Sequence, residues 1–175
     1  MCYMENIKKY AELTVKVGVA VKEGQKVIIK SSIEAIDLAR AVTEECYKVG
    51  AKDVIVEYVD EEITHQRLLN APMEVIEDFP KWRIDGLMTY IKEGACIINI
   101  VSSNPDLLSD VEPSRLAISN KVAAEGSLEY KEYVLGGKSC WTIVAYPNLD
   151  WARKVFPDLS DDDATNWSGD IDLSV

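Results

Sequence analysis

The order of apolar and polar residues predicts an α/β fold: a mostly parallel central sheet of about four strands with helices on both faces, a three-layer α/β/α arrangement. Three of the four predicted strands are nearly continuous apolar runs, which is typical of strands buried on both faces. Segments with helical spacing separate all of the strands, so each connection can return the next strand parallel to the last. The length of 175 residues, 47% of them hydrophobic, is sufficient for a folded core.

Short runs rich in Val and Ile predict the strands, because β-branched side chains pack well on a pleated surface. In chain order, the strands are expected at residues 26–30, 53–59, 95–101 and 139–146.

Apolar residues repeated at intervals of three and four predict the helices between these strands. In chain order, helices are expected at residues 5–22, 35–49 and 60–69, in two pieces that begin near Pro72 and Pro80, and at residues 113–134 and 150–156.

Glycine and serine mark several of the boundaries. Gly24 and Gly50 are expected to end the first two helices, since glycine adopts the left-handed conformation that follows many helix ends. Ser31 and Ser32 are expected to cap the second helix. Gly126 is expected to be a weak point in the long helix near the end of the chain.

Residues 5–160 are predicted to form one domain, without a low-complexity linker. Residues 161–175 are rich in aspartate and poor in apolar residues. Such a segment offers little to bury, so an acidic, disordered tail outside the core is expected.

The charge balance argues against some classes of partner. The chain has 19 Lys and Arg against 30 Asp and Glu, a net charge of −11. This field repels nucleic acid and anionic lipid, so neither is an expected partner. The sequence also contains no apolar run long enough to span a membrane and no apolar signal core at its start, so a cytoplasmic location is expected.

The four cysteines, Cys2, Cys46, Cys96 and Cys140, are dispersed, and none forms a C-x-x-C pair. Three of them fall within apolar segments, where a free thiol packs as a small hydrophobic group. We therefore expect reduced core cysteines in a reducing compartment.

Motifs for nucleotide binding or serine hydrolysis are absent. The first strand is followed by Ser31-Ser32-Ile33-Glu34-Ala35 without a glycine, and neither G-x-G-x-x-G, G-x-x-x-x-G-K-[ST] nor G-x-S-x-G occurs. A nucleotide-binding module therefore remains only the third hypothesis, based on fold analogy.

Two groups of polar residues have both a functional and a structural interpretation. His65, the only histidine, could be a lone metal ligand or a general base, but its polar surroundings favour a solvated helix residue. Glu57, Asp60, Glu61 and Glu62 lie at or beyond the carboxyl end of the second strand and could form a ligand-binding lip there. Acidic residues at the start of a helix explain the last three of these equally simply. The residues themselves thus identify no catalytic, cofactor-binding or metal-binding position.

Several stretches resemble one enzyme family, in order along the chain. They are Lys9-Tyr10-Ala11-Glu12-Leu13 with Val17-Gly18, Gly24-Gln25 before Val27-Ile28-Ile29, Gly50-Ala51-Lys52, the segment from Asp60 to Pro72, and, most specifically, SCWTIVAYPNLDWARKVFPDL from Ser139 to Leu159. Together they cover residues 5 to 163 and resemble the amino-terminal domain of the aminopeptidase T/AmpS-type metalloaminopeptidases. After the acidic stretch the resemblance ends.

This resemblance implies a two-domain exopeptidase that removes amino-terminal residues with a pair of divalent metal ions, such as zinc, cobalt, manganese or magnesium. Members of the family place their metal ligands in the carboxyl-terminal domain, which has no counterpart here. We therefore expect no catalytic, cofactor or metal residue in this chain and no activity from the chain alone. A truncation, a frameshift or an expressed domain would each give such a sequence. The alternative hypothesis is a free-standing α/β binding or oligomerisation module.

The resemblance also implies a homodimer. The alternation of Trp141, Ile143 and Ala145 with Cys140, Thr142, Val144 and Tyr146 predicts that the fourth strand needs cover on both of its faces. Without a following helix, an apolar patch would remain and would favour self-association about a two-fold axis.

Overall fold

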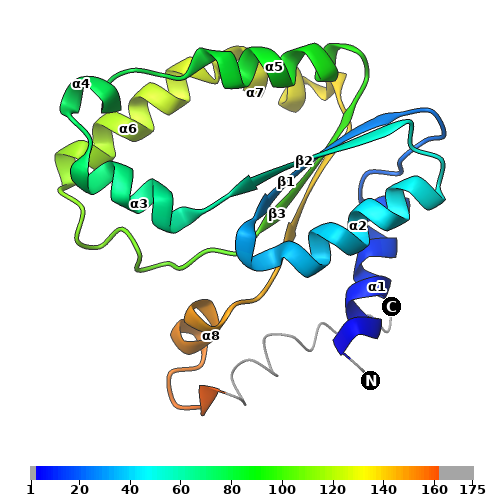
Figure 1. Cartoon of the computed structure of the whole chain (residues 1–175), viewed down its shortest axis with the longest axis horizontal. Helices are drawn as coiled ribbons and strands as arrows, with labels where there is room; N and C mark the ends of the chain where they lie inside the picture. Colours follow the sequence, from blue (N-terminus) through cyan, green and yellow to red (C-terminus); the bar gives the residue numbers. More distant parts are fainter. Residues whose placement is uncertain (1–2, 162–175) are drawn as a thin grey trace. The chain divides into compact units, whose positions relative to one another are not determined.

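The computed structural model of the chain describes residues 3–161, which divide into two compact units. The first unit contains residues 3–59, 96–105 and 141–161 and carries the sheet, and the second contains residues 60–95 and 106–140 and is helical (Figure 1). The acidic tail expected at residues 161–175 lies, apart from Asp161, outside the described residues.

The sheet of the first unit has four strands in the order β2-β1-β3-β4, and all three neighbouring pairs are parallel (Figure 1). The bounds are β1 (Lys26–Ser32), β2 (Asp53–Val59), β3 (Cys96–Val101) and β4 (Trp141–Ala145). The predicted α/β class and parallel sheet are confirmed. Each strand lies within two residues of its predicted limits.

Four helical segments of the first unit contribute to the core on one face of this sheet. They are α1 (Tyr3–Leu13), its π-helical continuation η1 (Thr14–Gly18), the 3-10 turn η2 (Ile33–Ala35) and α2 (Ile36–Lys48). The remaining helix, α8 (Leu149–Val155), follows β4 at the carboxyl ends of the strands. The core beneath α1 and α2 includes Val27, Ile29 and Ile98, which are fully buried. Hydrophobic burial of this face stabilises the unit.

The end of α2 shows why Gly50 is needed. Gly50 adopts a φ of 89°, and its N–H donates to the carbonyl of Tyr47 while the N–H of Ala51 donates to that of Cys46. These two bonds satisfy carbonyls that a helix end otherwise leaves unpaired. The predicted stop at Gly50 is therefore confirmed.

Two predicted boundaries of the first unit are wrong. The first helix ends at Gly18 and not at Gly24, because Ala20 adopts a left-handed φ of 49° that turns the chain out of the helix. Ser31 and Ser32 lie within β1 and make no side-chain cap. Their hydroxyls bond instead to backbone groups, that of Ser31 to the Ser32 carbonyl at 2.9 Å and that of Ser32 to the Ser102 N–H at 3.1 Å.

The second unit contains α3 (Glu61–Asn70), α4 (Met73–Ile76), α5 (Lys81–Lys92), α6 (Pro113–Gly126), α7 (Leu128–Tyr133) and the π-helical turn η3 (Val134–Lys138). Its own small core is formed by Leu68, Ile76 and Val111, which are all buried. The guanidinium of Arg115 donates to the carbonyls of Leu68 and Ala71, so it satisfies the carboxyl end of α3.

The predicted weak point at Gly126 is confirmed, since α6 ends there and α7 begins at Leu128. A Cβ atom added to Gly126 would lie 2.2 Å from the ring atoms Cγ and Cδ1 of Phe79. The two segments can approach each other this closely only because residue 126 has no side chain.

We predict that Gly126→Ala destabilises the protein by about 1–3 kcal/mol, because the Phe79 ring must leave its place. This cost outweighs the gain of about 0.5–1 kcal/mol that alanine normally brings to a helix. Urea unfolding followed by circular dichroism measures the change in the free energy of unfolding.

Gly86→Ala in α5 is the matched control. A Cβ at Gly86 would meet no atom within 4 Å, so this variant should gain about 0.5–1 kcal/mol of stability. Equal stabilisation of both variants would show that the Phe79 contact does not constrain position 126.

Candidate functional site

Polar side chains connect the carboxyl ends of the strands in the first unit. The Asn148 Nδ2 donates to the Ser102 Oγ at 3.0 Å and to the Ser103 carbonyl at 3.2 Å, while the Asn148 Oδ1 accepts from the Trp151 N–H at 2.8 Å. Ser102 in turn donates its own N–H to the Ser32 Oγ. These bonds tie the ends of β1 and β3 to the start of α8.

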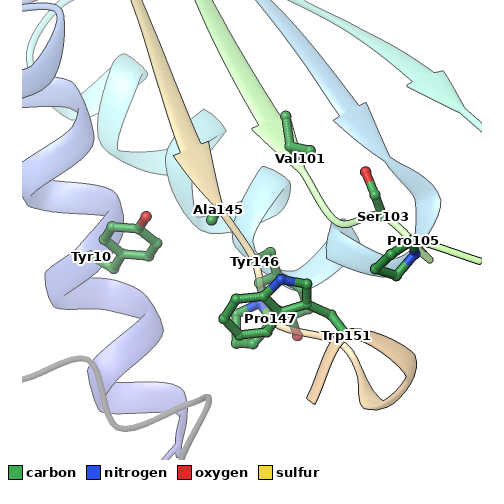
Figure 2. Close-up of a pocket in the computed structure, with 8 residues that line it drawn as sticks. All are labelled: Tyr10, Val101, Ser103, Pro105, Ala145, Tyr146, Pro147 and Trp151. Carbon is green, nitrogen blue, oxygen red and sulfur yellow. The ribbon is translucent and has the colours of Figure 1, made fainter. Parts of the chain in front are cut away.

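A cavity of about 360 Å³ opens beside this network, at the carboxyl ends of β3 and β4 (Figure 2). It is lined by Tyr10, Val101, Ser103, Pro105, Ala145, Tyr146, Pro147 and Trp151. The Trp151 ring extends from α8 below the ends of the two strands in this view. Ligands of open α/β sheets bind at this end of the strands, so the cavity is the candidate functional site.

The lining can bind a ligand but carries no obvious catalytic group. None of the eight side chains is charged at neutral pH. Burial raises the pKa of the Tyr10 phenol, an effect larger than the opposing one of the hydrogen bond to the Ala145 backbone, so the ring stays neutral. Ser103 has no histidine among these lining residues to act as its base.

His65 lies in α3 of the second unit, in a side-chain cluster separate from the residues of the cavity. Its Nε2 lies 2.7 Å from the Asp110 Oδ1, and its Nδ1 lies 3.9 Å from a carboxylate oxygen of Glu62. The imidazole is 12% exposed. It is therefore largely covered, whereas the sequence favoured a solvated helix residue. This arrangement joins α3 to the segment that precedes α6.

The acidic residues beyond β2 have a structural role. Asp60 is the N-cap of α3, and its Oδ1 accepts from the N–H groups of Glu62 at 2.9 Å and Ile63 at 3.3 Å. Glu61 and Glu62 occupy the first turn of the same helix, where negative charge is stabilised. The helix-start interpretation is therefore supported, and none of these residues lines the cavity.

The cysteines divide by burial. Cys46 and Cys96 are free and buried, and burial raises the pKa of Cys46 to about 12. Cys140 is also free but exposed, so its assignment to the core was wrong. It directly precedes β4, an edge strand on which alternate residues are exposed. Cys2 lies outside the described residues.

Within residues 3–161 no group of three or more His, Cys, Asp or Glu side chains is placed to hold a metal ion. The donors that a catalytic metal needs are therefore not assembled in this part of the chain. The same residues contain no helix that is long and apolar enough to cross a membrane.

The fold and the sequence together define a class of protein. Residues 3–169 match the family described as thermophilic metalloprotease (M29), and the chain belongs to this family.

Several of its relatives are aminopeptidases. The chain is 38% identical to aminopeptidase 2 of Geobacillus stearothermophilus, over 91% of this chain and 39% of that protein. It is 36% identical to aminopeptidase AmpS of Bacillus subtilis, over 93% of this chain and 40% of the relative. The structure of wild-type AmpT from Thermus thermophilus superposes with a TM-score of 0.89 at 32% identity, over 95% of this chain and 42% of that one.

The chain thus spans about two fifths of the length of the curated relatives that it matches. The activity of a whole relative is therefore not a property that these residues establish for this chain.

We predict that Asn148→Ala lowers the free energy of unfolding by about 1–3 kcal/mol. The variant loses the cap on Trp151 and the donor to the buried Ser102 hydroxyl. Chemical unfolding monitored by tryptophan fluorescence measures this loss.

Asn70→Ala is the control, because Asn70 is exposed and bonds Gln66 within α3. It should change stability by less than about 0.5 kcal/mol. If both variants lose the same amount, the Asn148 network does not hold the strand ends together.

Proposed function

We propose that this chain is the amino-terminal, non-metal-binding part of a metal-dependent aminopeptidase, which removes the first residue of peptides, and that the chain is inactive alone. The observation that supports this most is the match to the metalloprotease family over residues 3–169, combined with coverage of about 40% of each aminopeptidase. In such an enzyme the metal would be held by the carboxyl-terminal domain, since residues 3–161 of this chain contain no suitable donor cluster.

Metal-dependent peptide hydrolysis needs an activated water and a polarised carbonyl, both supplied by the metal when bound. In such an enzyme the described residues would shape the cleft and support assembly. The metals we propose are zinc, cobalt, manganese or magnesium, and the proposed location is the cytoplasm.

We also propose that the chain forms a two-fold dimer. Trp141 and Ile143, on one face of the edge strand β4, are 41% and 60% exposed, while Val144 on the opposite face packs against the core. Exposed neighbouring apolar side chains on a sheet edge favour association with another chain.

The purified chain should show no metal-dependent turnover of a leucyl chromogenic substrate with zinc, cobalt, manganese or magnesium. The reason is that the described residues do not assemble the ligands that position a catalytic metal. AmpS of Bacillus subtilis, assayed under the same conditions, is the positive control. Turnover that co-elutes with the chain and requires metal would overturn the proposal of inactivity.

A chimera tests the positive part of the proposal. This chain replaces the matching 40% of AmpS, and we expect a folded protein with metal-dependent aminopeptidase activity. A chimera that folds and binds metal but hydrolyses no peptide would favour the free-standing module instead.

Ile143→Glu should raise the dimer dissociation constant at least about tenfold, because a charge in an apolar contact loses its hydration. Light scattering over a wide concentration range measures the molar mass. Ile63→Glu is the control, since Ile63 is 68% exposed on α3. A parent chain that stays monomeric at high concentration would refute the dimer.

A further inference from the structure

We propose that the cavity at the ends of β3 and β4 binds the ring-bearing apolar side chain of a peptide residue that also carries a protonated amino group. This inference rests on the proposed function, because it names the kind of peptide that the domain would receive. It concerns binding alone and assigns no catalytic step to the cavity.

The shape and surface of the cavity fit an aromatic side chain. Its volume of about 360 Å³ lies at the small end of the range for ligand pockets. Two prolines, two tyrosines and Trp151 provide ring surfaces on its walls, and Val101 and Ala145 provide a floor from the strands (Figure 2). Ring-on-ring contacts add to the gain from burying apolar area.

The walls are held in place before any ligand arrives. The backbone N–H of Trp151 is bonded to Asn148, and Asn148 is bonded to Ser102 and Ser103 at the end of β3. Ser102 is 2% exposed and Ser32, which accepts its N–H, is 8% exposed. A preorganised wall lowers the entropy that a ligand loses on binding.

The charge beside the cavity is negative, which favours an ammonium group. Asp150 directly precedes Trp151, and its Oδ2 lies 3.2 Å from the Nδ2 of Asn104, which directly precedes Pro105. A carboxylate therefore lies next to two lining residues.

The guanidinium of Arg153 neutralises the negative charge of Asp150 only in part, because it also pairs with Asp161. Arg153 forms a two-point pair with Asp161, at 2.9 and 2.7 Å, and lies 3.7 Å from Asp150. The three groups together carry one excess negative charge, so a carboxylate ligand would be repelled and an amine attracted.

The test is titration of the chain with L-phenylalaninamide, followed by the NMR signals of the tryptophan indole N–H groups. The Trp151 signal, assigned from the Trp151→Phe variant, should shift and saturate with a Kd of about 1–5 mM. Glycinamide, which has the amine but no ring, should leave this signal in place up to about 20 mM. N-acetyl-L-phenylalaninamide, which has the ring but no charge, should bind about two- to threefold more weakly than L-phenylalaninamide.

Three variants test separately what the space in the cavity, the Trp151 ring and the Asp150 charge contribute to binding. Ala145→Phe fills the cavity from β4 and should abolish the shift. Trp151→Ala removes the reporting indole, so its binding is followed by the NMR signals of L-phenylalaninamide itself, and it should be at least about fivefold weaker than that of the parent chain measured in the same way. Asp150→Asn should remove the preference for the charged amide over its acetylated form. Trp82→Ala is the matched control, because Trp82 is 75% exposed and lies outside the lining, and it should bind like the parent chain.

Unchanged binding to Ala145→Phe would overturn the proposal, as would an equal response to glycinamide. If the Trp151 signal shifts with protein concentration alone, a second copy of the chain occupies the cavity and the peptide proposal is wrong. None of these readings depends on metal or turnover, so they stay distinct from the test of the proposed aminopeptidase role.

Discussion

Burial of the two central strands is the constraint on which the rest of the structure depends. In β1 and β3, Ile29 and Ile98 face the core beneath α1 and α2, while Ile28 and Ile97 point to the opposite face, and all four are at most 1% exposed. A polar side chain on such a strand needs a hydrogen-bond partner, as Asn99 of β3 has in the Thr142 carbonyl. At the carboxyl ends of these strands, Ser32 is the last residue of β1 and Ser102 directly follows β3. The Ser32 Oγ accepts from the Ser102 N–H, and the Ser102 Oγ accepts from Asn148.

The edge strand β4 does not share this constraint, and both proposed binding surfaces include it. Its residues alternate between half-buried and exposed, so Val144 contributes to the core while Ile143 does not. Ala145 then forms part of the cavity at the end of the strand. One strand thus supplies an apolar face for association and part of the cavity floor, because only its inner side is required by the core.

The acidic side chains show why a metalloprotease relative can lack a metal site in these residues. Asp60 caps α3, Asp110 pairs with His65, and Asp161 holds Arg153. Carboxylates that bond separate backbone and cationic groups do not converge on one point, as metal ligands must. In the described part of the chain, these three carboxylates therefore cap one helix and pair with a histidine and an arginine.

The sequence by itself determined the strand positions, the parallel sheet, the stop at Gly50 and the break at Gly126, because apolar spacing and the conformational freedom of glycine are local properties. It also carried the family resemblance, through residues 139–159 above all. Only the tertiary structure decided that the Ser32 hydroxyl accepts from the Ser102 N–H instead of capping a helix, that Cys140 is exposed and that His65 contacts Asp110. It alone brought Tyr10 to the same cavity as Trp151. These partners lie between 45 and 141 positions apart, and no local pattern specifies which distant group a side chain will meet.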